Sequence, residues 1–446
     1  MPTTRSDPVH QSANSETGPA TPTRWRLATR VGFRFCLVYF GLFCLLFAQI
    51  TFVFTGVFAP RLPDHAVLWQ LIALEPLLSW VGRIVFGVDA QLRLDSGSGD
   101  QAVIWVLVST LLVLATIVTA LWSILDRRRP EYTRLHAWFL VFVRLCLGGQ
   151  MLFYGMAKVI PTQMPAPPPS ALLQPYGEFS PASVLWLQVG SSQPYEMLLG
   201  SVEVLGGVLL FLPATATLGA LISLAGMGQV FLMNMTFDVP VKILSFHLLL
   251  LSLVLLAPQL RRLADLLVFG RPSEPVGQPP LFASARANRR ATAVQVVLGV
   301  WVLLGATLIS WDAWRDYGGG SPKPELYGIW TVTEFVRDGV VAPPLTTDDR
   351  RWQRLVFDTG VAAAVQKMDG TLQPAQADID AAARELRLDG AEAGTFSFVR
   401  DGADTLQLSG TWTDAPVRVR LQRTDPGSFP LLSRGFHWVQ EYPYFR

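Results

Sequence analysis

Polar and ionisable side chains that lie inside otherwise apolar segments are the residues of this chain best suited to chemistry. A charge at bilayer depth costs several kcal/mol, so such residues usually face the interior of a helical bundle and are candidates for a functional site. The residues of this kind are Arg144, Tyr154, Lys158, Glu203, Asn234, Asp238, Lys242 and His247. Helical spacing places Tyr154 and Lys158 on one face, with Arg144 a few tens of degrees away.

Two interpretations of this set remain open. Paired charges, Lys158 with Glu203 and Asp238 with Lys242, could hold helix ends together without any further role. Alternatively, the polar residues could form a pocket in the outer half of the bundle that binds a small amphiphile or passes protons. Lys158 would then reach Glu203 at the centre of the pocket. His247, deep in a helix, is either a satisfied core residue or a titrating one.

Motifs of known catalytic chemistry do not occur in the sequence, so the catalytic residues are unknown. The chain has no Gly-x-Ser-x-Gly, phosphate loop, His-Glu-x-x-His or Cys-x-x-Cys motif. Its five histidines lack the spacing of metal ligands, and no metal is predicted. The three cysteines lie inside apolar runs, which indicates buried thiols rather than a disulfide framework. The net charge of +2 gives no indication of a nucleic-acid partner.

The elements that must position these residues are membrane helices. Half of the residues are hydrophobic, only 16% are charged, and the mean hydropathy is +0.34. About seven apolar runs approach or exceed the roughly 20 residues that a crossing helix needs. They lie at 31–58, 101–125, 134–160, 196–213, 215–236, 240–257 and 291–313. The sequence therefore predicts a polytopic α-helical membrane bundle over residues 24–314, after a disordered tail at 1–23.

Arginines predict the orientation of this bundle. They cluster at 24–34, 127–134 and 261–290, in alternate connections, and such clusters mark the cytoplasmic side. We therefore expect a multi-pass protein of the inner (plasma) membrane, with a cytoplasmic N-terminus and an extracytoplasmic C-terminus. Residues 65–88 are predicted to form an interfacial amphipathic helix, because charges interrupt them. Asp100 is predicted to cap the helix that follows.

The two remaining long segments are a proline-rich connection and a C-terminal domain. Residues 161–195 begin with repeated prolines, which are typical of a stiff strap over the outer mouth of the bundle or of a plain extended linker. After a linker at 315–324, residues 325–446 alternate apolar and polar residues between Asp-Gly pairs. This pattern predicts roughly eight short strands in a small antiparallel β-barrel outside the membrane.

Two resemblances to known families add expectations. The features of the first, in chain order, are Arg144, Gly155, Lys158, a proline-containing loop, Glu203 and a tight turn at 212–215. In these features residues 134–270 resemble the DoxX family of small bacterial membrane proteins. The resemblance implies a four-helix membrane module and suggests a link to quinone, because one branch of the family serves thiosulfate:quinone oxidoreduction. The transmembrane domain related to vitamin K-dependent carboxylases is an alternative, without a specific motif here.

The second resemblance lies at the start of the C-terminal domain. Gly328 and Trp330 match the Gly-x-Trp entry of the lipocalin family, where the tryptophan closes the barrel floor and often packs under an arginine. The resemblance implies that Arg434 fills that role. The alternative is a buried strand tryptophan in some other barrel.

Together these patterns predict a non-catalytic membrane scaffold or a protein that binds a lipid or quinone. The expected partners are bilayer lipid, such a ligand, and a periplasmic or redox protein. The alternative is a component of a quinone-linked membrane oxidoreductase, with a quinone as cofactor. Because no cofactor motif is present, the quinone itself or a partner would then have to carry electrons.

Overall fold

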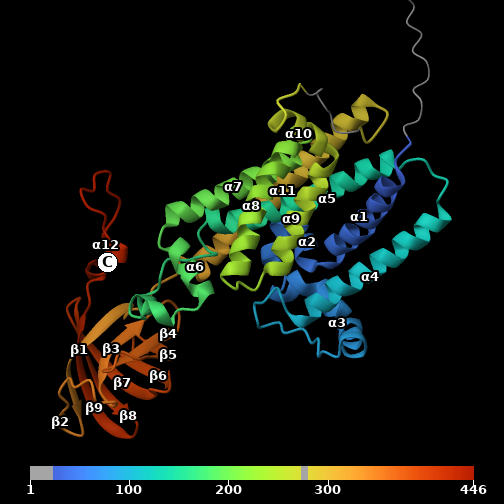
Figure 1. Cartoon of the computed structure of the whole chain (residues 1–446). Coiled ribbons are helices and arrows are strands. Elements are labelled where there is room, and N and C mark those ends of the chain that lie inside the picture. The colour runs from blue at the N-terminus through green and yellow to red at the C-terminus, as the bar shows by residue number, and fades with distance from the viewer. Residues whose placement is uncertain (1–23, 273–279, 446) are drawn as a thin grey trace, which may run out of the picture.

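The computed structural model describes residues 24–272 and 280–445, and the predicted disorder of residues 1–23 lies outside this part of the chain. Within it, a bundle of long helices is followed by a β-barrel (Figure 1). The predicted fold class, a polytopic helical bundle with a C-terminal antiparallel barrel, is confirmed.

The helices follow the apolar runs of the sequence. Their bounds are α1 Leu27–Leu46, α2 Ala48–Phe52, α3 Trp69–Val81, α4 Ala102–Leu125, α5 Thr133–Val159, α6 Pro181–Gly190, α7 Gln193–Phe211, α8 Ala216–Thr236, α9 Lys242–Leu256, α10 Leu260–Leu267, α11 Ala285–Asp316 and α12 Pro430–Ser433. Eight helical segments in the described residues are long and apolar enough to cross a membrane. Seven overlap the predicted spans, and the eighth is Asp64–Phe86.

The segment Asp64–Phe86 begins and ends at the same end of the bundle. Residues before α3 (Asp64, Leu68) and residues after it (Leu92, Arg93) line one cavity. Figure 1 shows α3 at the end of the bundle where α4 begins. This geometry favours a segment lying at one end of the bundle over an eighth crossing.

The other connections also sort to two ends. At one end, the backbone N–H of Trp25 donates to the carbonyl of Pro130, which joins the start of α1 to the α4–α5 connection. At the other end, the N–H of Gly99 donates to the carbonyl of Pro240, which joins the α3–α4 connection to the turn before α9. This alternation agrees with the positions of the arginine clusters.

Helices α5, α7, α8 and α9 form a ring, with α5 in contact with both α7 and α9. The closest approach, between α5 and α7, depends on two glycines. A Cβ atom at Gly200 would lie 2.6 Å from the carbonyl oxygen of Gly155, and a Cβ at Gly155 would lie 2.9 Å from the carbonyl oxygen of Gly200. Small residues therefore let the two backbones touch, as is common between membrane helices.

The barrel is an antiparallel meander. Its strands are β1 Gly328–Arg337, β2 Val340–Val341, β3 Trp352–Phe357, β4 Ala362–Lys367, β5 Leu372–Asp380, β6 Glu385–Gly390, β7 Gly394–Asp401, β8 Thr405–Trp412 and β9 Ala415–Arg423. Strand β1 pairs with both β3 and β9, so eight strands close into a barrel, and the short β2 extends β1 as a hairpin. Asp338 and Gly339 both have positive φ there, as the predicted Asp-Gly turn requires.

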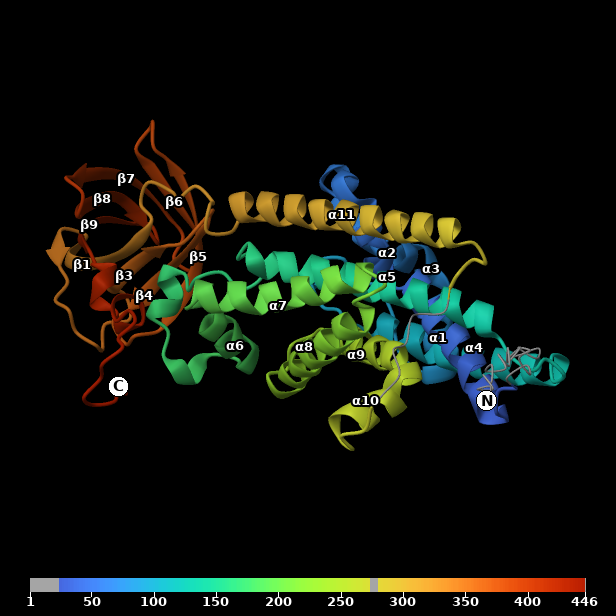
Figure 2. The same ribbon diagram turned by 90° about the horizontal axis from the view of Figure 1, so that it is seen from above.

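Large aromatic side chains fill the interior of the barrel. Trp330, Phe335, Trp352 and Phe396 are all at most 1% exposed and belong to one apolar cluster. Strand β9 alternates buried and exposed residues along its length, as predicted from the sequence. Figure 2 shows α11 running along the bundle and leading directly to this domain.

A second connection joins the bundle to the barrel. We call residues 161–173 the strap. The Ser170 backbone N–H and hydroxyl both donate to the carboxylate of Asp358, at 3.1 and 2.5 Å. Leu172 and Leu173 pack against a small apolar cluster on the outside of the barrel that includes Ile329 and Val356. The barrel is therefore attached both by the chain after α11 and by the strap.

Candidate functional site

A cavity of about 200 Å³, which we call the inner cavity, lies among α5, α7, α8 and α9. The strap and α6 cover it. Most of its wall is apolar, formed by leucine, valine, methionine and tryptophan side chains. Four residues of the set singled out from the sequence line it: Tyr154, Lys158, Glu203 and Asn234. The structure therefore brings four of the eight residues together around one cavity.

An ion pair between Lys158 and Glu203 forms the most polar part of the wall. Lys158 Nζ lies 2.8 Å from Glu203 Oε2, and the two side chains are only 7% and 6% exposed. The close approach of α5 and α7 at Gly155 and Gly200 brings the two side chains within reach. A buried lone charge would be costly, so each residue stabilises the charged form of the other.

Gln163 in the roof of the inner cavity, and Glu196, which binds the roof residue Met164 without lining the cavity, retain unused hydrogen-bonding capacity. Glu196 Oε1 accepts from the backbone N–H of Met164 at 2.9 Å, and Trp186 Nε1 donates to the carbonyl of Gln163 at 2.9 Å. The second carboxylate oxygen of Glu196 and the amide oxygen of Gln163 are buried and have no hydrogen-bonding partner among the described residues. Such orphaned groups are rare in proteins and mark places where a ligand or water can bind.

Tyr154 and Asn234, the other two predicted residues in the wall, have partners of their own. The Tyr154 hydroxyl accepts from Gln49 Nε2 at 2.6 Å, and Lys158 Nζ lies 5.9 Å from the centre of the Tyr154 ring. Asn234 Nδ2 donates to Ser245 Oγ at 3.0 Å and to the carbonyl of Val241 at 3.3 Å. Asn234 thus ties the end of α8 to the start of α9.

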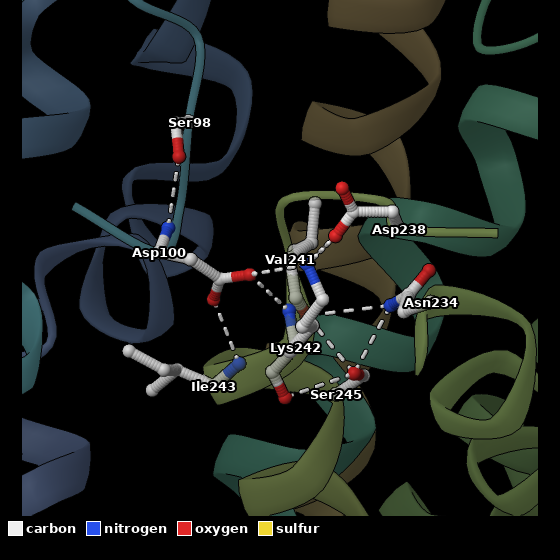
Figure 3. A network of polar contacts seen from close by, with 8 residues as sticks. All are labelled: Ser98, Asp100, Asn234, Asp238, Val241, Lys242, Ile243 and Ser245. Atoms are coloured by element: carbon white, nitrogen blue, oxygen red, sulfur yellow. Dashed lines mark hydrogen bonds and ion pairs between the residues drawn. The ribbon is translucent and has the colours of Figure 1, made fainter. Parts of the chain in front are cut away.

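Asp238 and Lys242 pair as predicted, but outside the inner cavity (Figure 3). Lys242 Nζ lies 2.9 Å from Asp238 Oδ1, and the Asp238 side chain is 84% exposed. Asp100 completes the network, because its carboxylate accepts from the backbone N–H groups of Lys242 and Ile243, both at 2.9 Å. The prediction that Asp100 caps α4 is wrong: it caps α9 instead.

The structure also corrects the grouping of His247 and Arg144 with the pocket. His247 faces α1, where its Nε2 lies 2.8 Å from the Tyr39 hydroxyl and its ring stacks on Phe43 at 3.9 Å. Its Nδ1 lies 2.7 Å from the carbonyl of Ile243 and therefore donates to it. Both ring nitrogens have hydrogen-bonding partners, so His247 fits the first of its two interpretations, a satisfied core residue. Arg144 is 1% exposed and donates to Gln295 of α11.

At the barrel floor, the structure agrees with the prediction for Trp330 but not for Arg434. The Trp330 ring is 1% exposed, and its Nε1 donates to the carbonyl of Leu326 at 2.7 Å. Gly328 has φ of 126°, a conformation that glycine adopts readily. Arg434 lies in the tail after β9, where it contacts His437 and the ring of Tyr444, because the chain leaves the barrel after its last strand.

Arg400 does lie near the floor: its guanidinium is 6.0 Å from the centre of the Trp330 ring. Sequence reasoning also missed a buried pair inside the barrel. Lys367 Nζ lies 2.8 Å from Glu392 Oε1, and the other oxygen of Glu392 accepts from Trp352 Nε1 at 2.9 Å. The sequence gives no indication that Lys367, close to an Asp-Gly turn, points into the barrel.

In the described residues, no group of three or more His, Cys, Asp or Glu side chains could hold a metal ion. The three cysteines are free, and Cys44 and Cys146 are buried.

Comparison with known proteins gives one relative. The chain is 35% identical over 122 residues to the uncharacterized protein YwoB of Bacillus subtilis (strain 168). The match covers 25% of this chain and 71% of the relative. No family model matches the chain, and no solved structure matches it.

Proposed function

Because the chain belongs, through a quarter of its length, to the family of YwoB, whose name assigns no activity, we propose its function from the geometry of the inner cavity. The protein is a multi-pass membrane protein that binds the polar head of a small amphiphile, a lipid or a quinone, in this cavity. It catalyses no reaction of its own and displays the barrel to a partner.

One observation carries this proposal: an otherwise apolar cavity is lined by a buried ion pair and by Gln163, whose amide oxygen has no partner among the described residues. Binding sites for small molecules are typically apolar with a few convergent polar groups. A structural clamp between Lys158 and Glu203 would need no space beside it, whereas about 200 Å³ is present. The amide oxygen of Gln163, free of partners among the described residues, can accept from a ligand hydroxyl.

A pair of glycines on α8 provides a sharp test. Gly226 lines the inner cavity, and the nearest atom to a Cβ built there is the end of Met151 at 4.0 Å, so Gly226→Leu would fill the cavity without a backbone clash. Gly228 is the matched control, because it does not line the cavity and a Cβ there also has room.

The experiment is to purify both variants and the wild-type protein in mild detergent and to identify co-purifying lipids and quinones by mass spectrometry. We expect a ligand in the wild type and in Gly228→Leu but not in Gly226→Leu. Equal recovery from all three, or no ligand from any, would contradict the proposal. A quinone whose reduction state changes with an added donor would favour the alternative, a quinone-linked oxidoreductase component of the DoxX type.

The proposed orientation places the barrel outside the cytoplasm of a bacterium. The arginine clusters near α1, in the α4–α5 connection and before α11 support it, because positive residues stay on the cytoplasmic side. Fusions at residue 320 test it. Active alkaline phosphatase and a dark cytoplasmic fluorescent protein agree with the proposal, and the reverse pattern refutes it.

For the barrel, we propose docking of an extracytoplasmic protein rather than capture of a ligand. The closed eight-strand barrel is consistent with the lipocalin resemblance, but aromatic side chains occupy its interior. A filled core leaves the outer surface and the loops as the parts that recognise a partner. Uptake of a lipid or quinone analogue by the barrel itself would contradict this assignment.

A further inference from the structure

A second hollow, which we call the outer cavity, lies next to the inner one and has a volume of about 480 Å³. Its walls come from α2, from the segment Asp64–Leu71 and from the connection 92–101. Phe47, Leu71 and Ile104 form part of an apolar floor, while Asp64 and Arg93 lie at an exposed rim. The outer cavity is therefore amphiphilic, with its charged side toward the end of the bundle.

The two cavities share a wall. Tyr154 and Val241 line both of them. The Tyr154 hydroxyl is held by Gln49 Nε2 at 2.6 Å, and Gln49 lines the outer cavity. Val241 is tied by its carbonyl to Asn234 and precedes the start of α9, which Asp100 caps. Backbone contacts thus hold Val241 in place in the shared wall, whereas Tyr154 contributes a side chain to it.

Size argues that the two cavities act together. Pockets that bury a drug-sized ligand measure about 300–1,000 Å³. The inner cavity alone, at about 200 Å³, falls below this range. The inner and outer cavities joined fall well within it. A ligand with a ring-sized head and an apolar chain would fill both, with its head beside Lys158 and its chain along Phe47 and Leu71.

We propose that the two cavities form one extended binding site for an amphiphile with a hydroxyl-bearing ring head and an apolar chain, and that Tyr154 is the movable partition between them. This inference rests on the proposed function, because it needs a ligand in the inner cavity. Rotation of the Tyr154 side chain away from Gln49 opens the connection between the two cavities, and the Tyr154 ring then packs against the ligand. Tyr154 therefore determines which ligands can occupy both cavities.

Two benzoquinol probes, held in the reduced state, test the inference, one with a short side chain and one with a ten-carbon chain. Their binding to the full-length protein in nanodiscs is measured as affinity and association rate. Leu68→Trp fills the outer cavity, and Leu77→Trp is the matched control, since Leu77 is 54% exposed on the same segment and lines neither cavity. Leu94→Trp, at the exposed rim, replaces Leu68→Trp if the latter does not fold.

We expect Leu68→Trp to weaken the long-chain probe at least tenfold and to leave the short probe unchanged, with Leu77→Trp neutral toward both. Gly226→Leu should weaken both probes. Tyr154→Phe, which loses the bond to Gln49 but keeps the ring, should raise the association rate of the long-chain probe alone.

The outcomes separate the two proposals. If the short probe binds and is lost in Gly226→Leu, while Leu68→Trp leaves the long-chain probe unaffected, the extended site is refuted and the inner site stands. An unchanged association rate in Tyr154→Phe refutes the role of Tyr154 as the partition. If neither probe binds the wild-type protein, the proposed function fails and the extended site fails with it.

Discussion

Neutralising one member of the Lys158–Glu203 pair should destabilise the protein far more than neutralising an exposed pair. Both side chains are less than a tenth exposed, and their charged atoms are 2.8 Å apart. Glu203→Gln leaves an ammonium group buried without its counter-charge, and Lys158→Met leaves a buried carboxylate. Removing one partner of a buried pair typically costs about 3–5 kcal/mol.

The Lys158 ammonium has limited alternatives after Glu203→Gln. The carbonyl of Tyr154 lies 3.5 Å away, at the limit of a hydrogen bond, and the Tyr154 ring centre lies 5.9 Å away. These two contacts stabilise the ammonium group less than the Glu203 carboxylate does. We therefore expect a loss near the lower end of that range for Glu203→Gln, about 3 kcal/mol, and a larger loss for Lys158→Met.

The chain provides its own control in Asp238 and Lys242. Their charged atoms are also 2.9 Å apart, but the side chains are 84% and 25% exposed. An exposed pair contributes only about 0.2–1 kcal/mol. Asp238→Asn is the cleanest control variant, because asparagine tolerates the positive φ of 52° at this position.

The assay is reversible unfolding in mixed micelles with increasing denaturing detergent, applied to both single variants, the double variant and Asp238→Asn. The double variant, Lys158→Met with Glu203→Gln, should recover most of the loss, because neither member of the pair is then left without the other. The double-mutant cycle then gives a coupling energy of up to about 3 kcal/mol. Single variants no less stable than Asp238→Asn would refute the reasoning, since the two charges would then not depend on each other.

Three further predictions follow from single contacts. Trp330→Ala should destabilise the barrel by about 3–5 kcal/mol, whereas Trp438→Ala, at a side chain that is 91% exposed, should change the free energy of unfolding by less than about 0.5 kcal/mol in chemical denaturation. Asp100→Ala should cost about 0.5–2 kcal/mol, because α9 loses its cap, and faster amide hydrogen exchange at the first turn of α9 would show this; unchanged exchange would contradict the cap. Asp358→Ala should free the strap from the barrel, so limited proteolysis should cut residues 161–173 faster; cleavage at the wild-type rate would show that Leu172 and Leu173 alone hold it.

The sequence predicted the inner cavity as far as charges inside apolar runs can predict it. Lys158 and Glu203 had to find partners. The rise per residue placed Lys158 near the surface and Glu203 roughly 10 Å deeper than Glu196, within reach of the lysine stem. Depth does not give the direction in which a side chain points. On α9 the cavity is lined by Leu244, Ser245 and Leu248, and His247 lies on another face, toward α1. Arg144 shares a face with Lys158 but lies about 21 Å further along the axis, beyond the cavity.

Apart from the Lys158–Glu203 pair, contacts between distant segments were beyond sequence reasoning. Asp100 stands directly before a helix, where a cap of that helix is the usual expectation, yet it caps α9 because the turn before α9 packs against it. Arg434 was placed by analogy with a barrel family rather than by a physical argument, and the tail carries it away from Trp330. Gln163 and Glu196 matter only because the strap folds over the bundle, which no local pattern encodes.

The strap makes the barrel and the cavity roof a single mechanical unit. Gln163 and Met164 stand over the inner cavity, and Ser170 is bound to Asp358 only a few residues later. The prolines between them resist bending, so the segment transmits a pull instead of absorbing it. A protein that binds the barrel and moves it sideways would therefore pull on the roof of the inner cavity directly. Tension applied to the barrel, outside the membrane, would thus reach the inner cavity without any movement of the helices.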